Sequence, residues 1–123
     1  MGKSTKMSAD DLKDLMHSAK KASDLLKAVA NENRLLLLCL LAEGEKSVTE
    51  LEGILALRQP TVSQQLARLR ADNLVNHRRE GKTIHYSLAS EEVREIIGLL
   101  YRMFCAEKRR ELTGERVSAA AAE

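Results

Sequence analysis

Hydrophobic positions in the first third of the chain recur at the spacing of a helix. Between Leu12 and Val29, apolar residues return every three or four positions, which predicts one helix with an apolar face. Ser8 precedes two aspartates there, a pattern typical of an N-cap followed by acids in the first turn. A second helix is predicted after Asn31, and its body, Leu35–Ala42, is apolar nearly all round. We expect this helix to lie at the centre of the fold and to end at Gly44.

Two shorter helices are predicted next, with few residues between them. Ser47 and Glu50 have the spacing of a capping box, which opens a helix over Ser47–Leu55. Pro60 suits the first turn of the following helix, Pro60–Ala71, because no helical partner is needed there for its missing N–H. The connection, Ala56–Gln59, has the length of the turn in a helix-turn-helix motif.

The apolar pattern changes from helical to alternating after Asn73, a residue that tolerates the left-handed turn ending a helix. Two strands, Val75–Arg79 and Thr83–Leu88, are predicted with a turn between them, and a last helix begins after Ser90. The order of these elements predicts an α+β fold, mostly α: a winged helix-turn-helix with a two-stranded β wing.

The first and last predicted helices carry more apolar surface than one small domain covers. In the last helix the apolar positions run from Val93 to Phe104, in a stripe too wide for a single packing surface. A homodimer through the first and last helices would bury the excess. The 123 residues otherwise have the size of a single domain, 1–123, with disordered tails expected at 1–7 and 113–123.

Composition indicates a folded protein without membrane spans. Hydrophobic residues make up 44% of the chain and charged residues 31%. The longest apolar run, Leu35–Ala42, is far shorter than the ~20 residues that cross a bilayer. Residues 1–11 lack the apolar stretch of a secretory signal. We therefore expect a cytoplasmic protein that does not associate with membranes, in a compartment where thiols stay reduced.

Positive charge is concentrated in one segment, although the net charge is only +2. Between Arg58 and Lys82 there are six basic residues against two acidic ones, whereas each flank has one acidic residue in excess. Charge alone would also fit a solvated face. The polar side chains of the predicted helix Pro60–Ala71, however, are types that pair with base edges, and basic hairpin residues can meet phosphates. The DNA-binding residues predicted in this way are Thr61, Ser63, Gln64, Gln65, Arg68, Arg78, Arg79 and Lys82.

Residues for catalysis or metal binding are not arranged in any familiar set. The sequence has no phosphate-cradling Gly-rich loop, no nucleophile with an evident base and orienting acid, and no close pair of cysteines. Its three histidines, His17, His77 and His85, are scattered, whereas structural zinc takes about four Cys or His ligands. We read them as surface or strand residues. The sequence predicts no enzyme, no cofactor and no metal site.

Three stretches together resemble the ArsR/SmtB family of winged-helix bacterial repressors: AVANENRLLLLCLL, QPTVSQQLARLRADNLV and RREGKTIHYSL. The resemblance covers roughly Leu12 to Cys105. It implies a homodimer bound to an inverted-repeat operator in double-stranded DNA, with the second stretch containing the recognition helix. By the same match Gln59 also lies on the recognition helix. Arg58 stands where many members have Ser and joins the DNA-binding set as a phosphate contact, and Asn73 replaces the usual Gly.

Cys39 and Cys105 are the candidate sensor. From the residues alone, each is either a small buried hydrophobe or a reactive thiol. The pair is similar to that of the persulfide-responsive SqrR/BigR-type branch of the family. This similarity implies that reactive sulfur species or oxidation link the two cysteines, directly or through several sulfurs, and release the repressor from DNA. We expect at least one lowered thiol pKa, with Arg102, Lys108 and Arg109 as sources of positive charge.

Two other regulatory functions remain open. The family includes metal-responsive repressors, although the usual ligand patterns are missing from the helix TELEGIL and from the last helix. Regulators of the HlyU type have a similar pair of cysteines, which implies an alternative output in which the protein displaces another DNA-binding protein. An enzyme of sulfur or peroxide chemistry and a protein-binding winged helix are the competing classes outside DNA binding.

Overall fold

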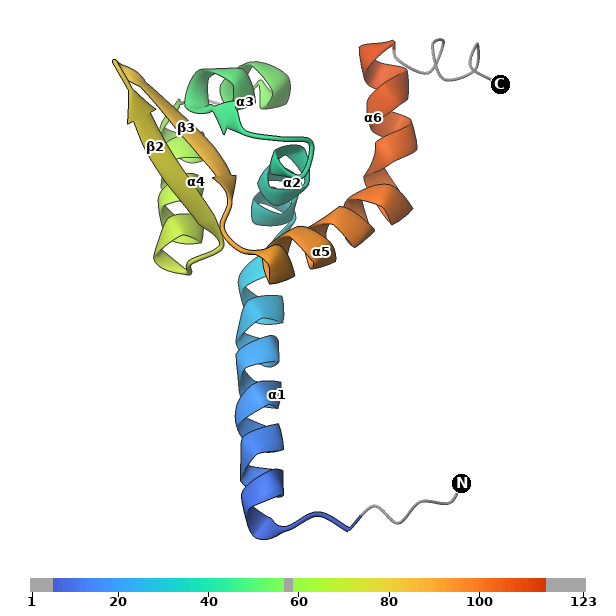
Figure 1. The fold of residues 1–123 in the computed structure, drawn as a ribbon. Coiled ribbons are helices and arrows are strands. Elements are labelled where there is room, and N and C mark those ends of the chain that lie inside the picture. Colours follow the sequence, from blue (N-terminus) through green and yellow to red (C-terminus); the bar gives the residue numbers. More distant parts are fainter. Residues whose placement is uncertain (1–5, 57–58, 115–123) are drawn as a thin grey trace. The chain divides into compact units, whose positions relative to one another are not determined.

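The computed structural model describes residues 6–56 and 59–114, and the chain divides into two compact units, Met1–Asn31 and Glu32–Glu123 (Figure 1). The first unit holds α1 (Ala9–Val29). The hydroxyl of Ser8 accepts a hydrogen bond from the amide of Asp11 at 3.0 Å, and the Asp11 carboxylate accepts from the Ser8 amide at 3.4 Å. The predicted N-cap is therefore confirmed, and it is a reciprocal capping box.

The second unit contains the other helices and all the strands that the structure describes. Its elements follow in the order α2 (Glu32–Leu41), β1 (Lys46–Ser47), α3 (Val48–Leu55), α4 (Gln59–Ala71), β2 (Val75–Glu80), β3 (Thr83–Leu88), α5 (Glu91–Leu100), the π-helical turn η1 (Tyr101–Cys105) and α6 (Ala106–Thr113).

The sheet is antiparallel, with strand order β1-β3-β2. β2 and β3 form the predicted hairpin, with Val75 opposite Leu88 and Glu80 opposite Thr83. Gly81 turns the chain between them with a φ of 65°, in the left-handed region that glycine adopts without steric cost. The two-stranded wing is thus confirmed. β1 was not predicted, because two residues are too few to show alternation.

The core of the second unit forms around α2. Leu37 and Leu38 of this helix are almost completely buried, as predicted from its apolar circumference. Leu51 from α3, Leu66 from α4 and Ile97 from α5 are buried with no exposed surface. Burial of each such side chain contributes about 1.5–3 kcal/mol relative to exposure. These side chains fix the helix-turn-helix and the start of the last helical segment on one core.

The predicted last helix is not continuous. It begins as expected after Ser90, whose hydroxyl accepts from the amide of Val93 at 3.2 Å. At Tyr101 the backbone changes to π-helical hydrogen bonding, and the amide of Ala106 donates to the carbonyl of Tyr101. A π turn adds one residue to the helical repeat and rotates the helix that comes after it. Cys105 lies at the end of this turn, directly before α6.

Candidate nucleic-acid interface and thiol pair

The helix-turn-helix is built from α3 and α4. The hydroxyl of Ser47 accepts from the Glu50 amide at 3.0 Å, and the Glu50 carboxylate accepts from the Ser47 amide at 2.7 Å. This arrangement confirms the predicted capping box. α3 ends at Leu55, and its C-cap, Ala56, has a left-handed φ of 55°. α4 begins at Gln59, one residue before the predicted start, so Pro60 lies in the first turn.

α4 has a buried face and an outward face. Val62, Leu66 and Leu69 are fully buried, whereas Gln64 and Arg68 are exposed one turn apart. Arg68 pairs with Asp72 at 3.4 Å, a surface ion pair that is too weak to immobilise it. The remaining predicted residues of the helix are placed less directly: Thr61, Ser63 and Gln65 are half-buried, Gln59 is described only by its helical backbone, and Arg58 lies outside the described residues.

The basic residues of the hairpin divide between its two faces. Arg78 donates from Nε and Nη2 to the two carboxylate oxygens of Glu45, both at 2.8 Å, and from Nη1 to Glu80 at 3.4 Å. The hydrogen bonds with Arg78 lower the pKa of Glu45 and raise that of the arginine. Arg79, the next residue, points to the opposite face because side chains alternate along a strand.

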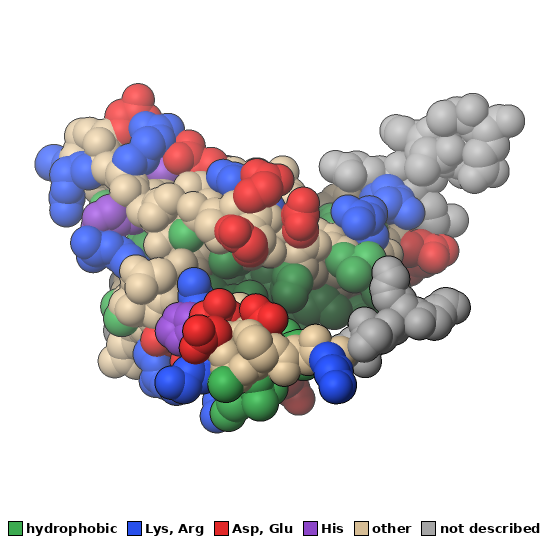
Figure 2. Space-filling view, turned by 60° about the horizontal axis from the view of Figure 1, so that its bottom comes forward, with side chains coloured by type: hydrophobic (Ala, Val, Ile, Leu, Met, Phe, Trp, Pro, Cys, Tyr) green, Lys and Arg blue, Asp and Glu red, His purple; other side chains and the backbone are tan. Residues whose placement is uncertain are grey.

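Arg79 and Lys82 are exposed, and no carboxylate of the described residues pairs with either. Figure 2 shows basic side chains gathered, with histidine, over the end of the second unit that carries the hairpin. Of the three predicted hairpin residues, Arg79 and Lys82 are therefore available to a ligand, while Arg78 is held against Glu45. The two strand histidines, His77 and His85, lie where the sequence predicted them.

The two cysteines, which lie far apart in the sequence, are neighbours in the second unit. Cys39 is buried in α2 with 3% of its surface exposed, and Cys105 is half-buried at the end of η1. Burial raises the pKa of Cys39 to about 12, and the charge of Cys105 and a hydrogen bond between the two thiols act in the same direction. The Cys39 thiol is therefore protonated at neutral pH.

The lowered pKa that the sequence predicts for at least one of the two thiols is not found at Cys39, and Arg109, one of its three expected cationic sources, is engaged by a carboxylate. The pKa of Cys39 moves in the opposite direction, because burial disfavours the thiolate. Arg109 directs its guanidinium to a carboxylate: its Nε donates to Glu43 at 2.8 Å and its Nη2 at 3.3 Å. Arg102 and Lys108 are exposed, and Lys108 pairs with Glu111 at 3.7 Å.

Glu43 is the centre of a polar cluster beside the thiol pair. Besides Arg109, it accepts a hydrogen bond from the hydroxyl of Tyr101 at 2.9 Å and forms an ion pair with Lys46 at 3.2 Å. Burial alone would raise the pKa of Glu43, but the bonds from Tyr101, Arg109 and Lys46 outweigh it, so the pKa is lowered. The side chain is only 18% exposed, so these partners hold it firmly.

The Glu43–Arg109 pair connects the same two segments of the chain as the two cysteines do. Glu43 follows Cys39 by four residues, and Arg109 follows Cys105 by four. Sequence reasoning found the cysteines but missed the Glu43–Arg109 pair. The equal spacing of an acid and a base after the two cysteines was the signal that would have revealed it.

Metal clusters and membrane spans are both absent from the described part of the chain. Residues 6–56 and 59–114 contain no group of three or more His, Cys, Asp or Glu side chains that is arranged to hold a metal ion. Over the same ranges no helix combines the length and hydropathy needed to span a bilayer.

A helix-turn-helix followed by an antiparallel hairpin makes the second unit a winged-helix domain. Residues 31–77 match the bacterial regulatory protein, arsR family. The chain is 48% identical over 95 residues to the transcriptional activator HlyU of Vibrio cholerae, covering 77% of this chain and 88% of that protein. It is 50% identical over 88 residues to the biofilm growth-associated repressor of Agrobacterium fabrum, covering 72% and 75%.

The fold agrees with these relatives. The structure of reduced HlyU from Vibrio cholerae matches with a TM-score of 0.72 and 48% identity, over 76% of this chain and 99% of that one. The chain therefore belongs to the ArsR family of bacterial regulatory proteins. It is a transcriptional regulator and not an enzyme, and regulators of this family bind operator DNA.

Proposed function

We propose that the protein is a homodimeric repressor that leaves its inverted-repeat operator when Cys39 and Cys105 become linked. The observation that carries this proposal is the closeness of the two thiols: Cys105 of η1 lies near enough to Cys39 of α2 to raise its pKa. A buried cysteine with a half-buried partner suits a resolving thiol and an attacking thiol. HlyU of Vibrio cholerae, a relative of the same family, has been solved in a reduced form, which adds support for a redox-sensitive state.

The proposed DNA contacts follow from the faces of α4 and the hairpin. Gln64 and Arg68 lie on the outward face of α4 and would enter the major groove, where their side chains pair with base edges. Arg79 and Lys82 extend from the hairpin and would meet phosphates. In a symmetric dimer these surfaces would address two half-sites about one turn of DNA apart.

The proposed chemistry begins at Cys105, because Cys39 is buried and protonated. The Cys105 thiolate attacks the sulfane sulfur of a persulfide, RSSH, and the S–S bond of the reagent breaks to release RSH. The sulfur of Cys39, losing its proton, then attacks Sγ of Cys105 and expels hydrosulfide, which forms a disulfide. The two thiols lose two electrons, and the sulfane sulfur gains them.

Longer bridges follow from the same steps. If a second persulfide first extends the chain on Cys105, attack of Cys39 on the sulfur before the last also expels hydrosulfide and leaves a trisulfide. A direct disulfide needs Cα atoms within about 7 Å, whereas packed helix axes lie about 8–10 Å apart. A direct disulfide between two such helices would therefore be strained, and extra sulfur atoms lengthen the bridge and relieve this strain. Persulfides are thus favoured over peroxide as inducers.

Linking the cysteines would disturb the path from η1 to the helix-turn-helix. Tyr101 begins η1 and donates to Glu43, and Lys46, the other partner of Glu43, lies in β1 directly before Ser47. Ser47 caps α3, the first helix of the motif. A covalent bond at Cys105 would change the geometry of the π turn and therefore the bonds around Glu43. The orientation of the helix-turn-helix would follow.

The deciding experiment combines DNA binding and mass spectrometry. The reduced protein, a Cys39→Ser variant and a Cys105→Ser variant are each tested for binding to an operator selected from random duplexes, before and after treatment with a persulfide or with peroxide. We expect all three to bind when reduced and only the wild type to be released. Its mass should show a link between the cysteines with added sulfur. Full release of either single variant would refute the two-cysteine switch.

One comparison favours a second function, the activation of transcription. HlyU of Vibrio cholerae is named a transcriptional activator, so this protein would instead act by displacing another DNA-binding protein. In that case it would bind the same DNA as a resident repressor and raise transcription. Transcription from the target promoter in vitro distinguishes the two outputs, because a repressor alone lowers it and an activator of this kind raises it only when the resident repressor is present.

A further inference from the structure

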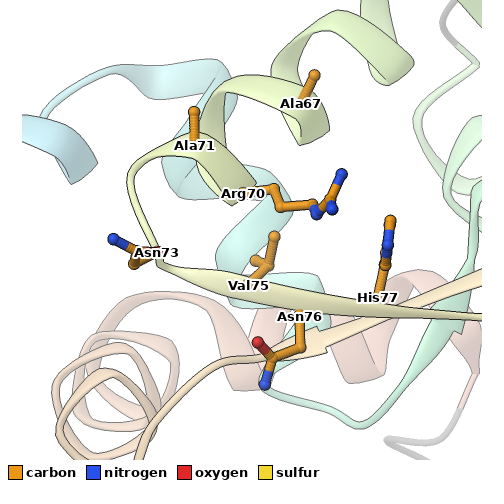
Figure 3. Close-up of a pocket in the computed structure, with 7 residues that line it drawn as sticks. All are labelled: Ala67, Arg70, Ala71, Asn73, Val75, Asn76 and His77. Atoms are coloured by element: carbon orange, nitrogen blue, oxygen red, sulfur yellow. The ribbon is translucent and has the colours of Figure 1, made fainter.

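A groove between α4 and β2 contains basic residues that the predicted DNA-binding set does not include. It is a cavity of about 660 Å³ with Arg70 of α4 and His77 of β2 in its wall (Figure 3). The side chain of Arg70 extends from the helix toward His77, as Figure 3 shows. Asn76 points away from them, to the other side of the strand, where its amide donates to the carbonyl of Ala89 at 3.4 Å.

The chain between the two elements sets this geometry. α4 ends at Ala71, and Asn73 reverses the chain with a φ of 63°, so β2 returns beside the helix it follows. Val75 is buried against the core and anchors the start of the strand. His77, two residues on, points to the same face as Val75 because strand side chains alternate. Its ring contacts Tyr86 edge-to-face, with centroids 5.8 Å apart, which fixes its position.

The groove carries positive charge and no carboxylate. Three other cavities of the second unit each include at least one acid: Glu107 and Glu111 in one, Glu91 and Glu95 in another, and Glu43 in the third. The groove between α4 and β2 has none in its lining. No carboxylate within the described ranges pairs with Arg70 or His77. The alternation that places His77 on this face places Arg79 there too, at the outer end of the row.

We infer that this groove holds a phosphate of the DNA backbone, bound by Arg70 and His77 with Arg79 at its outer end. The inference rests on the proposed operator binding and adds a site to it. A phosphate presents only acceptors, and both wall residues supply donors. Arg70 lies on the flank of α4 that faces the hairpin, away from Gln64. Ala67 and Ala71 are exposed and small, which lets a sugar–phosphate strand approach the helix closely.

Arg78 is less available to a phosphate than Arg70 and His77 are. Arg78 is the adjacent arginine of β2, but it lies on the opposite face and its guanidinium is held by Glu45 and Glu80. Arg70 and His77 are both exposed in a cavity with no competing acid. Arg70 is therefore an available cation between the recognition helix and the wing, with His77 as an available hydrogen-bond donor beside it, although the sequence pattern pointed to Arg78.

The test compares Arg70→Gln and His77→Gln with Lys108→Gln, which removes an exposed positive charge from α6. Binding of the reduced proteins to the selected operator and to a random duplex is measured by fluorescence anisotropy over a salt series. We expect Arg70→Gln to weaken both duplexes by the same factor and to make the slope of log K against log salt shallower by about 2, about 1 for the contact in each half of the dimer. His77→Gln should weaken both duplexes by a smaller common factor, and Lys108→Gln should match the wild type.

Single methylphosphonate substitutions then locate the contact. Neutralising one phosphate per half-site should weaken wild-type binding, and the same substitution should cost much less with Arg70→Gln, where only the smaller contributions of His77 and Arg79 remain to be lost. Inorganic phosphate, titrated while the ring signals of His77 are followed by NMR, separates a general anion site from a DNA contact. Arg70→Lys should retain much of the affinity, and equal thermal unfolding midpoints show that Arg70→Gln is folded.

The outcomes separate this inference from the proposed function. If the wild type binds DNA but Arg70→Gln keeps its affinity and salt slope, the phosphate site is wrong and operator binding stands. A loss confined to the operator would also overturn the inference, because it indicates base reading. Binding of free phosphate without an effect on DNA would assign the groove to another anion. If the wild type binds no duplex at all, the proposed function and this inference fail together.

Discussion

At the scale of single residues, Gln64 and Arg79 test two different contributions to DNA binding: recognition of particular base pairs and attraction to the charged backbone. Gln64 is exposed on the outward face of α4, and Arg79 is exposed on the hairpin without a carboxylate partner in the described part of the chain. We expect Gln64→Ala to lower discrimination at particular base pairs by about 1–3 kcal/mol if it makes a bidentate contact. Arg79→Ala should weaken operator and random DNA alike. Anisotropy with both duplexes measures this; equal losses for Gln64→Ala would place the reading face elsewhere.

Cys39 provides a second test at this scale. Burial is the largest cause of its raised pKa, and Cys105 adds repulsion and a hydrogen bond. In Cys105→Ser the repulsion is removed while burial remains. The pKa of Cys39 should therefore fall from about 12 but stay above the ordinary value of 9.0. Thiolate absorbance in an alkaline titration measures the change. A pKa below 9.0 in this variant would show that burial is not the main cause.

At the scale of elements, Glu43 joins the turn after α2 to η1, α6 and β1. Glu43→Gln removes the charge that Tyr101, Arg109 and Lys46 share, while it keeps the size of the side chain. Charged hydrogen bonds contribute about 1.5–3 kcal/mol each against their loss. We expect a lower free energy of unfolding by roughly that amount at neutral pH, measured by urea denaturation. The matched control is Glu111→Gln, whose partner Lys108 is 71% exposed and which should change stability little.

The stability that Glu43 contributes depends on pH in a definite direction. The pKa of Glu43 is lowered below 4.5 in the folded protein, so the folded state favours its charged form. The stability that it contributes is complete above about pH 4.5 and is lost as the pH falls through the lowered pKa. The difference in unfolding free energy between wild type and Glu43→Gln should therefore shrink in acid. A difference that stays constant from neutral pH down to strong acid would contradict this role of Glu43.

The elements also show what a single sequence can predict. The caps of α1 and α3 were predicted because Ser8 and Ser47 bond within three residues of themselves. The hairpin was predicted because alternation persists through β3. The π turn at Tyr101 was missed, since apolar spacing continues through it unchanged. The Glu43–Arg109 pair was missed because its partners are 66 residues apart and depend on how α2 and α6 pack.

The candidate site, too, was predicted where it depends on local pattern and missed where it depends on tertiary packing. The outward position of Gln64 follows from the helical period of α4, so the sequence predicted it. The engagement of Arg78 with Glu45 and the groove at Arg70 depend on which face of β2 meets which neighbour. That information is tertiary, and residue types alone made Arg78 and Arg79 look equivalent.

At the scale of the whole molecule, the proposed switch has to change the spacing of two recognition helices. A symmetric dimer binds two half-sites only when its recognition helices match the helical repeat of DNA. A coupling free energy of about 1–3 kcal/mol between the cysteine link and operator binding would lower affinity roughly 5- to 150-fold. The coupling is reciprocal. Operator DNA should therefore disfavour formation of the Cys39–Cys105 link by the same free energy at equilibrium.

Exposed apolar residues on the last helical segment predict a dimer. Leu99, Met103 and Phe104 are 48%, 62% and 71% exposed along α5 and η1, an apolar stripe that the described chain leaves in solvent. Exposed apolar residues gathered in this way mark an interface. Leu99→Glu and Phe104→Glu would place a charge there, and we expect both to shift the protein from dimer to monomer and to weaken operator binding together.

Sedimentation velocity of the reduced protein at micromolar concentration measures this, beside anisotropy with the operator. Ile54→Glu is the control for the dimer, because Ile54 is 40% exposed on α3, outside the stripe, and its variant should sediment as the wild type does. The two readouts must move together. A monomer places only one recognition surface on the DNA. If Leu99→Glu were monomeric and still kept full affinity for the inverted repeat, dimerisation would not contribute to operator binding. A compact monomer for the unmodified wild type would remove the basis for a symmetric switch.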